Sequence, residues 1–471
     1  MYEPHRLHPA AILVFIGRNL RQMWQLLLPW FAIIISKWSS FKGWGTFLLA
    51  LTIVIYILYT VLYWMRYHYS LQGQDFLLEY GLFIRKKISI PLERIHGVQI
   101  SQGLVQRLFG LVKLEVETAG GGKKAEVSLV ALEQIEAERL RTALHGENAQ
   151  ASVETETKAA YQLTTGRLLL AASTSNGIGV TLVAMITVVS QLDEWFPTLQ
   201  LYEQAGQRLG HLFLSSYLSI ILGIVLALIL AWILSVVGWL ARYGSFTLIR
   251  EGDRILIKQG WVEKKQLNLP VHRLQAIMVV EGLLRRPLGL ASIQLVSAGY
   301  GDSSGTTVVI APLLRKTEIS SFLQTVLPEF AFETELEQID PRARFSYIMR
   351  LLFPSLLIAA PISIFVPYGY LSWLLPVAAI ILGNKQYHDA AWAIEADKLI
   401  LRSRSLGLVT SVIPRCRIQW LGVSQHLFQR RKGLHRLTLT TASTAGGASF
   451  ALPHIESKTA AIIKAWFQQY K

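Results

Sequence analysis

The stretch IPLERIHGVQISQGLVQRLFGLVKLEVETAGG, from Ile90 to Gly121, decides the fold because most of it occurs three times in the chain. Without a gap, Pro91 to Leu111 aligns with Pro270 to Leu290 and with Pro414 to Leu434. Six positions are identical in all three copies: Pro91, Pro270 and Pro414; Arg94, Arg273 and Arg417; Leu104, Leu283 and Leu427; Arg107, Arg286 and Arg430; Gly110, Gly289 and Gly433; Leu111, Leu290 and Leu434. The chain therefore contains a triplicated unit.

The sequence around each copy predicts short strands followed by one helix. After Gly110, apolar and polar residues alternate from Val112 to Glu117, which is the period of a half-buried antiparallel strand. Further strand-like runs precede each proline, with hairpin turns expected at Gly81 and Gly260. Helical spacing closes each copy at Leu132 to Leu144, Leu314 to Leu327 and Ile455 to Phe467. This order predicts an α+β unit, a small β-barrel or sandwich covered at one end by a helix.

Between these units lie apolar runs that predict membrane spans. The hydrophobic fraction is 52%, the mean hydropathy is +0.37 and charged residues make up only 16%, values that favour a membrane protein. Runs of spanning length are Trp44 to Met65, Leu168 to Ser190 and Phe213 to Leu240, and shorter ones are Met23 to Ser36, Leu351 to Val366 and Tyr368 to Gly383. Grouped by their connections, the six runs predict three transmembrane hairpins.

Hairpins return the chain to its starting side, so the three units and both termini are expected on one face of the membrane. The opposite face would hold only Lys37, Lys42 and Arg208 of the 46 lysines and arginines, which makes the unit-bearing face cytoplasmic. We expect a multipass protein of a bacterial inner membrane. The expected segments are 1–66 and 146–242 and 328–386 for hairpins with linkers, and 67–145, 243–327 and 387–471 for the three domains.

The repeated arginines are the first candidate site: Arg94, Arg107, Arg273, Arg286, Arg417 and Arg430. A guanidinium group can hold a phosphate headgroup through paired hydrogen bonds. Alternatively, these side chains bind loop carbonyl groups and fix the glycine turn, a scaffold role that would also recur in every copy. Both interpretations are open from the sequence.

A second candidate site consists of basic residues suited to a membrane surface: Arg85, Lys86, Lys87, Lys264, Lys265, Arg431 and Lys432. The net charge is +15, and this charge must lie in water, beside anionic headgroups or other anions. A solvated face or a protein-binding surface is the alternative. Nucleic acid is not expected as a partner, because no recognition motif accompanies the basic cluster near Arg431.

At the repeated motif the chain resembles the bacterial pleckstrin-homology-like (PH-like) domain family, in particular its YdbT-like membrane proteins. The resemblance rests on PLERIHGVQISQGLVQRLFGL at Pro91 to Leu111 and covers all three copies with their hairpins. The second and third copies depart from it at the turn, where Arg285 replaces Gln106 and Lys432 replaces Phe109. The resemblance implies a seven-stranded sheet with a C-terminal helix, and a role without catalysis.

The function expected from the sequence is that of a non-enzymatic binding or assembly protein. Its three domains would work at the membrane surface without a cofactor or metal, in a role such as cell-envelope homeostasis. Expected partners are anionic lipids, and either further copies of the chain or another PH-like membrane protein, since sheet edges can pair with neighbours. The competing hypothesis is a transporter or transporter accessory, for example in resistance to membrane-active antimicrobial peptides, with Asn176 as the polar residue to test.

Overall fold

The computed structural model describes residues 4–17, 44–118, 127–145, 160–175, 177, 179–185, 187, 217–297, 307–365, 369–443 and 447–469. The predicted span Met23 to Ser36 and the candidate Asn176 lie outside these residues. Within them, each copy of the motif contributes seven strands, and in each copy the first of these is only two residues long. All three of these short strands, β1, β8 and β15, lie in segments that were expected to hold the hairpins with their flanking residues.

The strands follow one pattern in every copy. The first copy contains β1 (His5–Arg6), β2 (His68–Gln72), β3 (Asp75–Tyr80), β4 (Lys86–Pro91), β5 (Ile95–Gln102), β6 (Leu111–Thr118) and β7 (Val127–Glu133). The second contains β8 (Tyr161–Gln162), β9 (Thr247–Glu251), β10 (Arg254–Gln259), β11 (Lys264–Pro270), β12 (Leu274–Glu281), β13 (Leu290–Ser297) and β14 (Thr307–Arg315). The third contains β15 (Glu337–Gln338), β16 (Ala391–Glu395), β17 (Lys398–Arg404), β18 (Leu408–Pro414), β19 (Ile418–Ser424), β20 (Leu434–Thr441) and β21 (Ala448–Glu456).

The helices also recur in equivalent places. A short helical turn of the motif is α4 (Leu104–Leu108) in the first copy and α13 (Leu427–Arg430) in the third, and 3₁₀ turns follow the prolines at η1 (Leu92–Arg94), η3 (Val271–Arg273) and η7 (Arg415–Arg417). The closing helices are α5 (Gln134–His145), α10 (Ile319–Val326, preceded by η4, Lys316–Glu318) and α14 (Ser457–Gln468). They begin later than predicted, because the strand before each of them continues to Glu133, Arg315 or Glu456.

Each copy is a sandwich of a four-stranded and a three-stranded sheet. In the first copy, Phe76 and Leu78 of β3 share one core with Leu114 of β6, Leu129 of β7 and Leu140 of α5. Burial of such side chains contributes about 1.5–3 kcal/mol each, so this shared core holds the two sheets together. The α+β expectation of antiparallel strands with a covering helix is confirmed, although the seven strands form two sheets instead of one.

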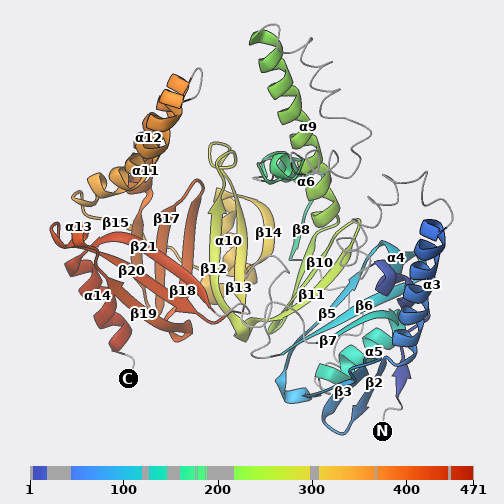
Figure 1. The fold of residues 1–471 in the computed structure, drawn as a ribbon. Coiled ribbons are helices and arrows are strands. Elements are labelled where there is room, and N and C mark those ends of the chain that lie inside the picture. Colours follow the sequence, from blue (N-terminus) through green and yellow to red (C-terminus); the bar gives the residue numbers. More distant parts are fainter. Residues whose placement is uncertain are drawn as a thin grey trace.

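The sheets do not stop at the limits of a copy. The three-stranded half of the first copy and the four-stranded half of the second form one sheet in the order β7-β6-β5-β11-β10-β9-β8. The second and third copies are joined in the same way, in the order β14-β13-β12-β18-β17-β16-β15. The four-stranded sheet β1-β2-β3-β4 and the three-stranded sheet β19-β20-β21 are left at the two ends. Figure 1 shows the three copies side by side in a row, coloured blue to cyan, green to yellow, and orange to red.

The identical glycine of the motif has a conformational cause. Gly110, Gly289 and Gly433 have φ of +67°, +64° and +64°, in the left-handed region that side chains with a Cβ atom rarely adopt. Each glycine lies directly before the first residue of the next strand, which is β6, β13 or β20. The repeat of glycine therefore reflects a backbone requirement that all three copies share.

The long apolar helices are α3 (Trp44–Met65), α9 (Tyr217–Tyr243), α11 (Ala343–Phe365) and α12 (Leu374–Asp389). Among the described residues, Val225–Tyr243 and Ala343–Phe365 are long and apolar enough to cross a membrane, and Ala50–Met65 is a shorter apolar stretch. Figure 1 shows α9, α11 and α12 projecting from the same side of the row. The three predicted hairpins remain a prediction, since the described part of the chain contains one complete pair, α11 with α12, joined through η6 (Gly369–Trp373).

The predicted span from Leu168 to Ser190 is wrong as a single helix. The helix α6 (Thr165–Ser173) ends where Arg285 of the second copy donates hydrogen bonds to the Ala171 carbonyl at 2.9 Å and to Thr174 Oγ1 at 3.3 Å. Leu168 and Ala171 lie in the core of the second copy. Helical structure resumes at residue 179. An arginine distant in sequence thus satisfies the Ala171 carbonyl group, which a continuing helix would have used.

Candidate functional site

The junction between the first and second copies is a strand pair. Strands β5 and β11 run antiparallel, with Gln102 opposite Lys264, Ser101 opposite Lys265 and Ile100 opposite Gln266. Backbone hydrogen bonds of such a ladder join the two sheets independently of side-chain identity, while the side chains choose the register. Two of the predicted basic residues, Lys264 and Lys265, therefore lie in an interface between copies.

The junction between the second and third copies repeats this pairing. Strands β12 and β18 pair with Glu281 opposite Leu408, Val280 opposite Val409 and Val279 opposite Thr410. In the alignment of the copies, Glu281 corresponds to Gln102 and Leu408 corresponds to Lys264. The two junctions therefore have the same register although their side chains differ.

The repeated arginine that follows the helical turn reaches across each junction. Arg107 Nη1 donates to the Trp261 carbonyl of the second copy at 3.3 Å. Its counterpart Arg286 forms a two-pronged ion pair with Asp389, the last residue of α12, at 2.8 and 2.7 Å. The third counterpart, Arg430, is exposed at the end of the row. The contacts of Arg107 and Arg286 are of the structural kind that the scaffold alternative describes, with the difference that they join neighbouring copies.

The other repeated arginine lies too far away to share a ligand with the first. Arg94 precedes the eight-residue strand β5 and Arg107 follows it, so the strand separates them by roughly 25 Å. Arg94 is exposed, and its counterparts Arg273 and Arg417 are half-buried at the ends of η3 and η7. The two arginines of one copy therefore cannot hold the same phosphate, and phosphate binding by either of them alone stays a prediction.

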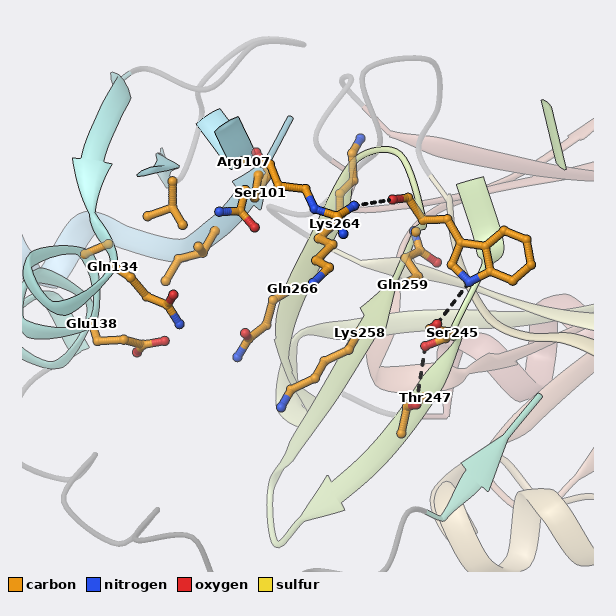
Figure 2. Close-up of a pocket in the computed structure, with 17 residues that line it drawn as sticks. Ser101, Arg107, Gln134, Glu138, Ser245, Thr247, Lys258, Gln259, Lys264 and Gln266 are labelled. Carbon is orange, nitrogen blue, oxygen red and sulfur yellow. Dashed lines mark hydrogen bonds between the residues drawn. The ribbon is translucent and has the colours of Figure 1, made fainter. Parts of the chain in front are cut away.

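A cavity of about 680 Å³ opens at the first junction. It brings together Arg107, Lys264 and Lys265, three residues predicted from the sequence, with Lys258 and the carboxylate Glu138. In Figure 2, Gln134 and Glu138 of α5 lie on one side of this cavity and Ser245 and Thr247 of the second copy lie on the other. Its excess of cationic groups suits an anion, and its walls belong to two copies.

The remaining predicted basic residues lie near the ends of the row. Arg85, Lys86 and Lys87 line a second cavity, of about 430 Å³, in which Lys87 also pairs with Glu79 at 2.7 Å. This pair lowers the pKa of the Glu79 carboxyl group. At the other end of the chain Arg431 and Lys432 follow α13, and Lys432 Nζ lies 4.1 Å from the centre of the Phe345 ring at the start of α11.

The sequence prediction missed a set of exposed apolar side chains in the turns of all three copies, which we call the apolar rim. Its members are Phe83, Ile84, Leu104, Leu108 and Phe109 in the first copy, Trp261, Val262, Leu283, Leu284 and Leu288 in the second, and Leu406, Leu427 and Phe428 in the third. The identity of Leu104, Leu283 and Leu427 was a visible signal for it. Interpreting these leucines as core residues would have been mistaken, because all three are exposed.

The rim lies beside the long apolar helices. Phe83 stacks on Tyr59 of α3, with ring centroids 6.5 Å apart. Trp261 donates from its backbone to the Ala241 carbonyl in the last turn of α9, and Gly244 leaves room for its indole ring. Lys432, directly after α13, contacts Phe345 of α11. Members of the rim in the first two copies, and a neighbour of the rim in the third, thus touch the base of an apolar helix.

Comparison with known proteins agrees with this architecture. A model of the bacterial PH domain matches residues 18–148, 204–329 and 349–471. The UPF0699 transmembrane protein YdbT of Bacillus subtilis (strain 168) is 32% identical over 493 aligned positions, which cover 100% of this chain and 99% of that protein. The resemblance inferred from the repeated motif is confirmed, and the chain belongs to the bacterial PH domain family.

Proposed function

We propose that this chain is a non-enzymatic, multipass membrane protein whose three PH-like domains form a rigid row against the bilayer and act there as a binding and assembly platform. The apolar rim carries this proposal. Apolar side chains are exposed in the turns of every copy, close to α3, α9 and α11, and two of these helices, α9 and α11, are long and apolar enough to cross a membrane. The distribution of lysine and arginine supports a cytoplasmic position for the soluble domains and both termini.

The rim has the exposure expected of side chains that enter the interfacial region of a bilayer. Phe83, Leu108 and Phe428 are 87%, 81% and 74% exposed. Removal of a fully exposed leucine or phenylalanine side chain from water contributes about 1.5–3 kcal/mol. Two or three such side chains in each copy would hold that copy at the headgroup boundary. Because shared sheets connect the copies, one docking event raises the effective concentration of the next.

Basic side chains near the rim fit the same surface. Arg85 and Lys86 are exposed beside Phe83, Lys264 is exposed beside Val262, and Arg431 and Lys432 follow Phe428. A lysine or arginine close to an anionic leaflet contributes about 1 kcal/mol. The combination of apolar tips and flanking cations is typical of proteins that lie on anionic membranes.

Lipid quenching in nanodiscs tests this proposal on the full chain. Cys416 is the only cysteine and is exposed, so Cys416→Ser gives a background for a single fluorescent label. Val262→Cys places the label in the rim at one end of β10, and Asp253→Cys places it in the turn at the other end, roughly 20 Å away. Brominated lipids should quench the label at residue 262 strongly and the label at residue 253 weakly. Equal quenching at the two positions would overturn the proposal.

The contribution of the basic side chains to membrane binding can be measured separately. In the same nanodiscs, a change from neutral to anionic lipid should increase quenching at residue 262. Replacement of Lys86, Lys264 and Lys432 by glutamine should remove that increase while leaving the quenching in neutral lipid unchanged. If the anionic lipid makes no difference, the rim works without headgroup recognition, and the lipid-charge part of the proposal is withdrawn.

A further inference from the structure

The ends of the row expose the same two strands that join the copies inside it. At each internal junction, the first strand after the 3₁₀ turn of one copy pairs with the strand before the proline of the next: β5 with β11 and β12 with β18. The corresponding strands at the ends are β19 and β4. Both are outermost in their sheets, and within the described residues no strand pairs with their outer edges.

The two end sheets are complementary halves. The C-terminal end has a three-stranded sheet with β19 at its edge, and the N-terminal end has a four-stranded sheet with β4 at its edge. A three-stranded and a four-stranded sheet are the components of each seven-stranded junction sheet. We propose that chains join end to end, with β19 of one chain pairing antiparallel with β4 of a second copy. This inference rests on the proposed membrane anchoring, which holds neighbouring chains in one orientation.

The register of this pairing follows from the internal junctions. In the alignment of copies, Ser424 corresponds to Ser101 and Val280, and Lys86 corresponds to Lys265 and Val409. Ser101 faces Lys265 and Val280 faces Val409. Ser424 of one chain is therefore placed opposite Lys86 of the next. By the same correspondence Val423 is placed opposite Lys87.

The free edge of β19 has exposed side chains that the internal junctions cover. Val279 of β12 is 4% exposed, whereas Val423, its counterpart in β19, is 38% exposed. Trp420 is also exposed, whereas its counterpart Ala276 is fully buried. Large apolar side chains beside an unpaired strand edge are typical of a surface that receives a partner.

The lysines of β4 do not prevent this pairing. Edge lysines commonly discourage strand addition. In this chain, however, β11 carries Lys264 and Lys265 at the positions of Arg85 and Lys86, and it pairs with β5 nevertheless. The exposed Arg430 is placed to repeat the contact of Arg107 with Trp261, by donating to the backbone carbonyl of Leu82 in the next chain. A contact of this head-to-tail type produces a ring when its rotation closes and an open row when it does not.

Disulfide cross-linking in membranes tests the register. Two differently tagged full-length chains, both Cys416→Ser, are expressed together, one with Ser424→Cys and the other with Lys86→Cys. Mild oxidation should give a dimer that contains both tags. The matched control replaces Lys86→Cys by Ser89→Cys, three positions along β4 and roughly 10 Å away, and should give little of this dimer. As a positive control, Val280→Cys with Val409→Cys in one chain should form the equivalent internal disulfide.

The outcomes separate this inference from the proposed function. A cross-link between residues 424 and 86 that falls about tenfold on Arg430→Ala supports end-to-end pairing. No dimer, or an equal yield with Ser89→Cys, overturns it, as does an adduct of Ser424→Cys with a different membrane protein in place of the second copy. If lipid quenching at residue 262 is intact in these failures, the membrane platform stands and only the pairing is lost. The same cross-link in detergent micelles tests the pairing if the quenching fails.

Discussion

Asp389 is the residue at which the contacts of the second junction can be tested most sharply, by measuring the free energy of unfolding. Its carboxylate accepts two hydrogen bonds from Arg286, at 2.8 and 2.7 Å, and one from Arg404. The Asp389 side chain is 14% exposed and the Arg404 side chain only 4%. The acid therefore neutralises a buried guanidinium group and at the same time ties the second copy to the end of α12.

The ion pairs of Asp389 with Arg404 and with Arg286 should contribute differently to the free energy of unfolding. Asp389→Ala leaves the buried charge of Arg404 without a counter-ion, and such a removal costs about 3–5 kcal/mol. Arg404 keeps its hydrogen bond to the Leu406 carbonyl at 3.1 Å, so we expect a loss near the lower limit, about 3 kcal/mol. Arg286→Ala removes a partner that is 40% exposed, for which about 1 kcal/mol is expected.

The measurement is the free energy of unfolding of the full chain in mixed micelles, titrated with a denaturing detergent and followed by tryptophan fluorescence. The double variant Asp389→Ala with Arg404→Met removes both buried partners and should recover most of the loss. Asp253→Ala is the control, because its partner His272 is largely exposed, and we expect less than about 1 kcal/mol. Equal losses for Asp389→Ala and Arg286→Ala, or no recovery in the double variant, would refute the assignment of the energy to Arg404.

Three further predictions follow from single side chains. Arg285→Gln introduces the residue found at this position in the other two copies, and should detach the end of α6, so that amide hydrogen exchange at residues 165–175 becomes at least about tenfold faster. Burial lowers the pKa of His454 to about 4, so between pH 6.5 and 4 this histidine binds a proton in the unfolded chain but not in the folded chain. Stability should therefore fall as the pH drops through this window. In the variant His454→Asn, the thermal unfolding temperature should depend less on pH. Gly110→Ala meets no atom within 4 Å, so its expected loss of about 1–2 kcal/mol in the detergent titration reports the backbone alone, and Gly110→Asn should lose less.

The features within one copy were predictable from the sequence because they depend on local patterns. The alternation after Gly110 specified β6, and the turns at Gly81 and Gly260 have φ of +107° and +103°, where a Cβ atom would meet a backbone carbonyl. The apolar run Trp44 to Met65 coincides with α3. Each of these signals lies within a few residues of the structure that it specifies.

The junctions could not be predicted in this way. The pairing of Ser101 with Lys265 joins residues far apart in the sequence, and the pattern within a strand does not say which strand of another copy will pair with it. The same holds for the end of α6, where the Ala171 carbonyl accepts a hydrogen bond from Arg285, more than one hundred positions away. The contact of Arg107 with the second copy could not be predicted either. An arginine is equally suited to bind a carbonyl group of its own copy and a carbonyl group of the next copy, so its identity does not distinguish the two.

The shared sheets have a consequence for how the row works. If each copy were a closed sandwich on a flexible linker, the tips of Phe83, Trp261 and Leu406 would move independently, and each would bind the bilayer with its own weak affinity. A ladder that continues from β5 into β11 and from β12 into β18 fixes these turns relative to one another. Unfolding of one copy would also expose the junction edge of its neighbour, a state that soluble proteins avoid. The row should therefore dock and unfold as a unit, and loss of the ion pair at Asp389 should weaken membrane contact at Trp261, in a different copy, as well as the stability of the third.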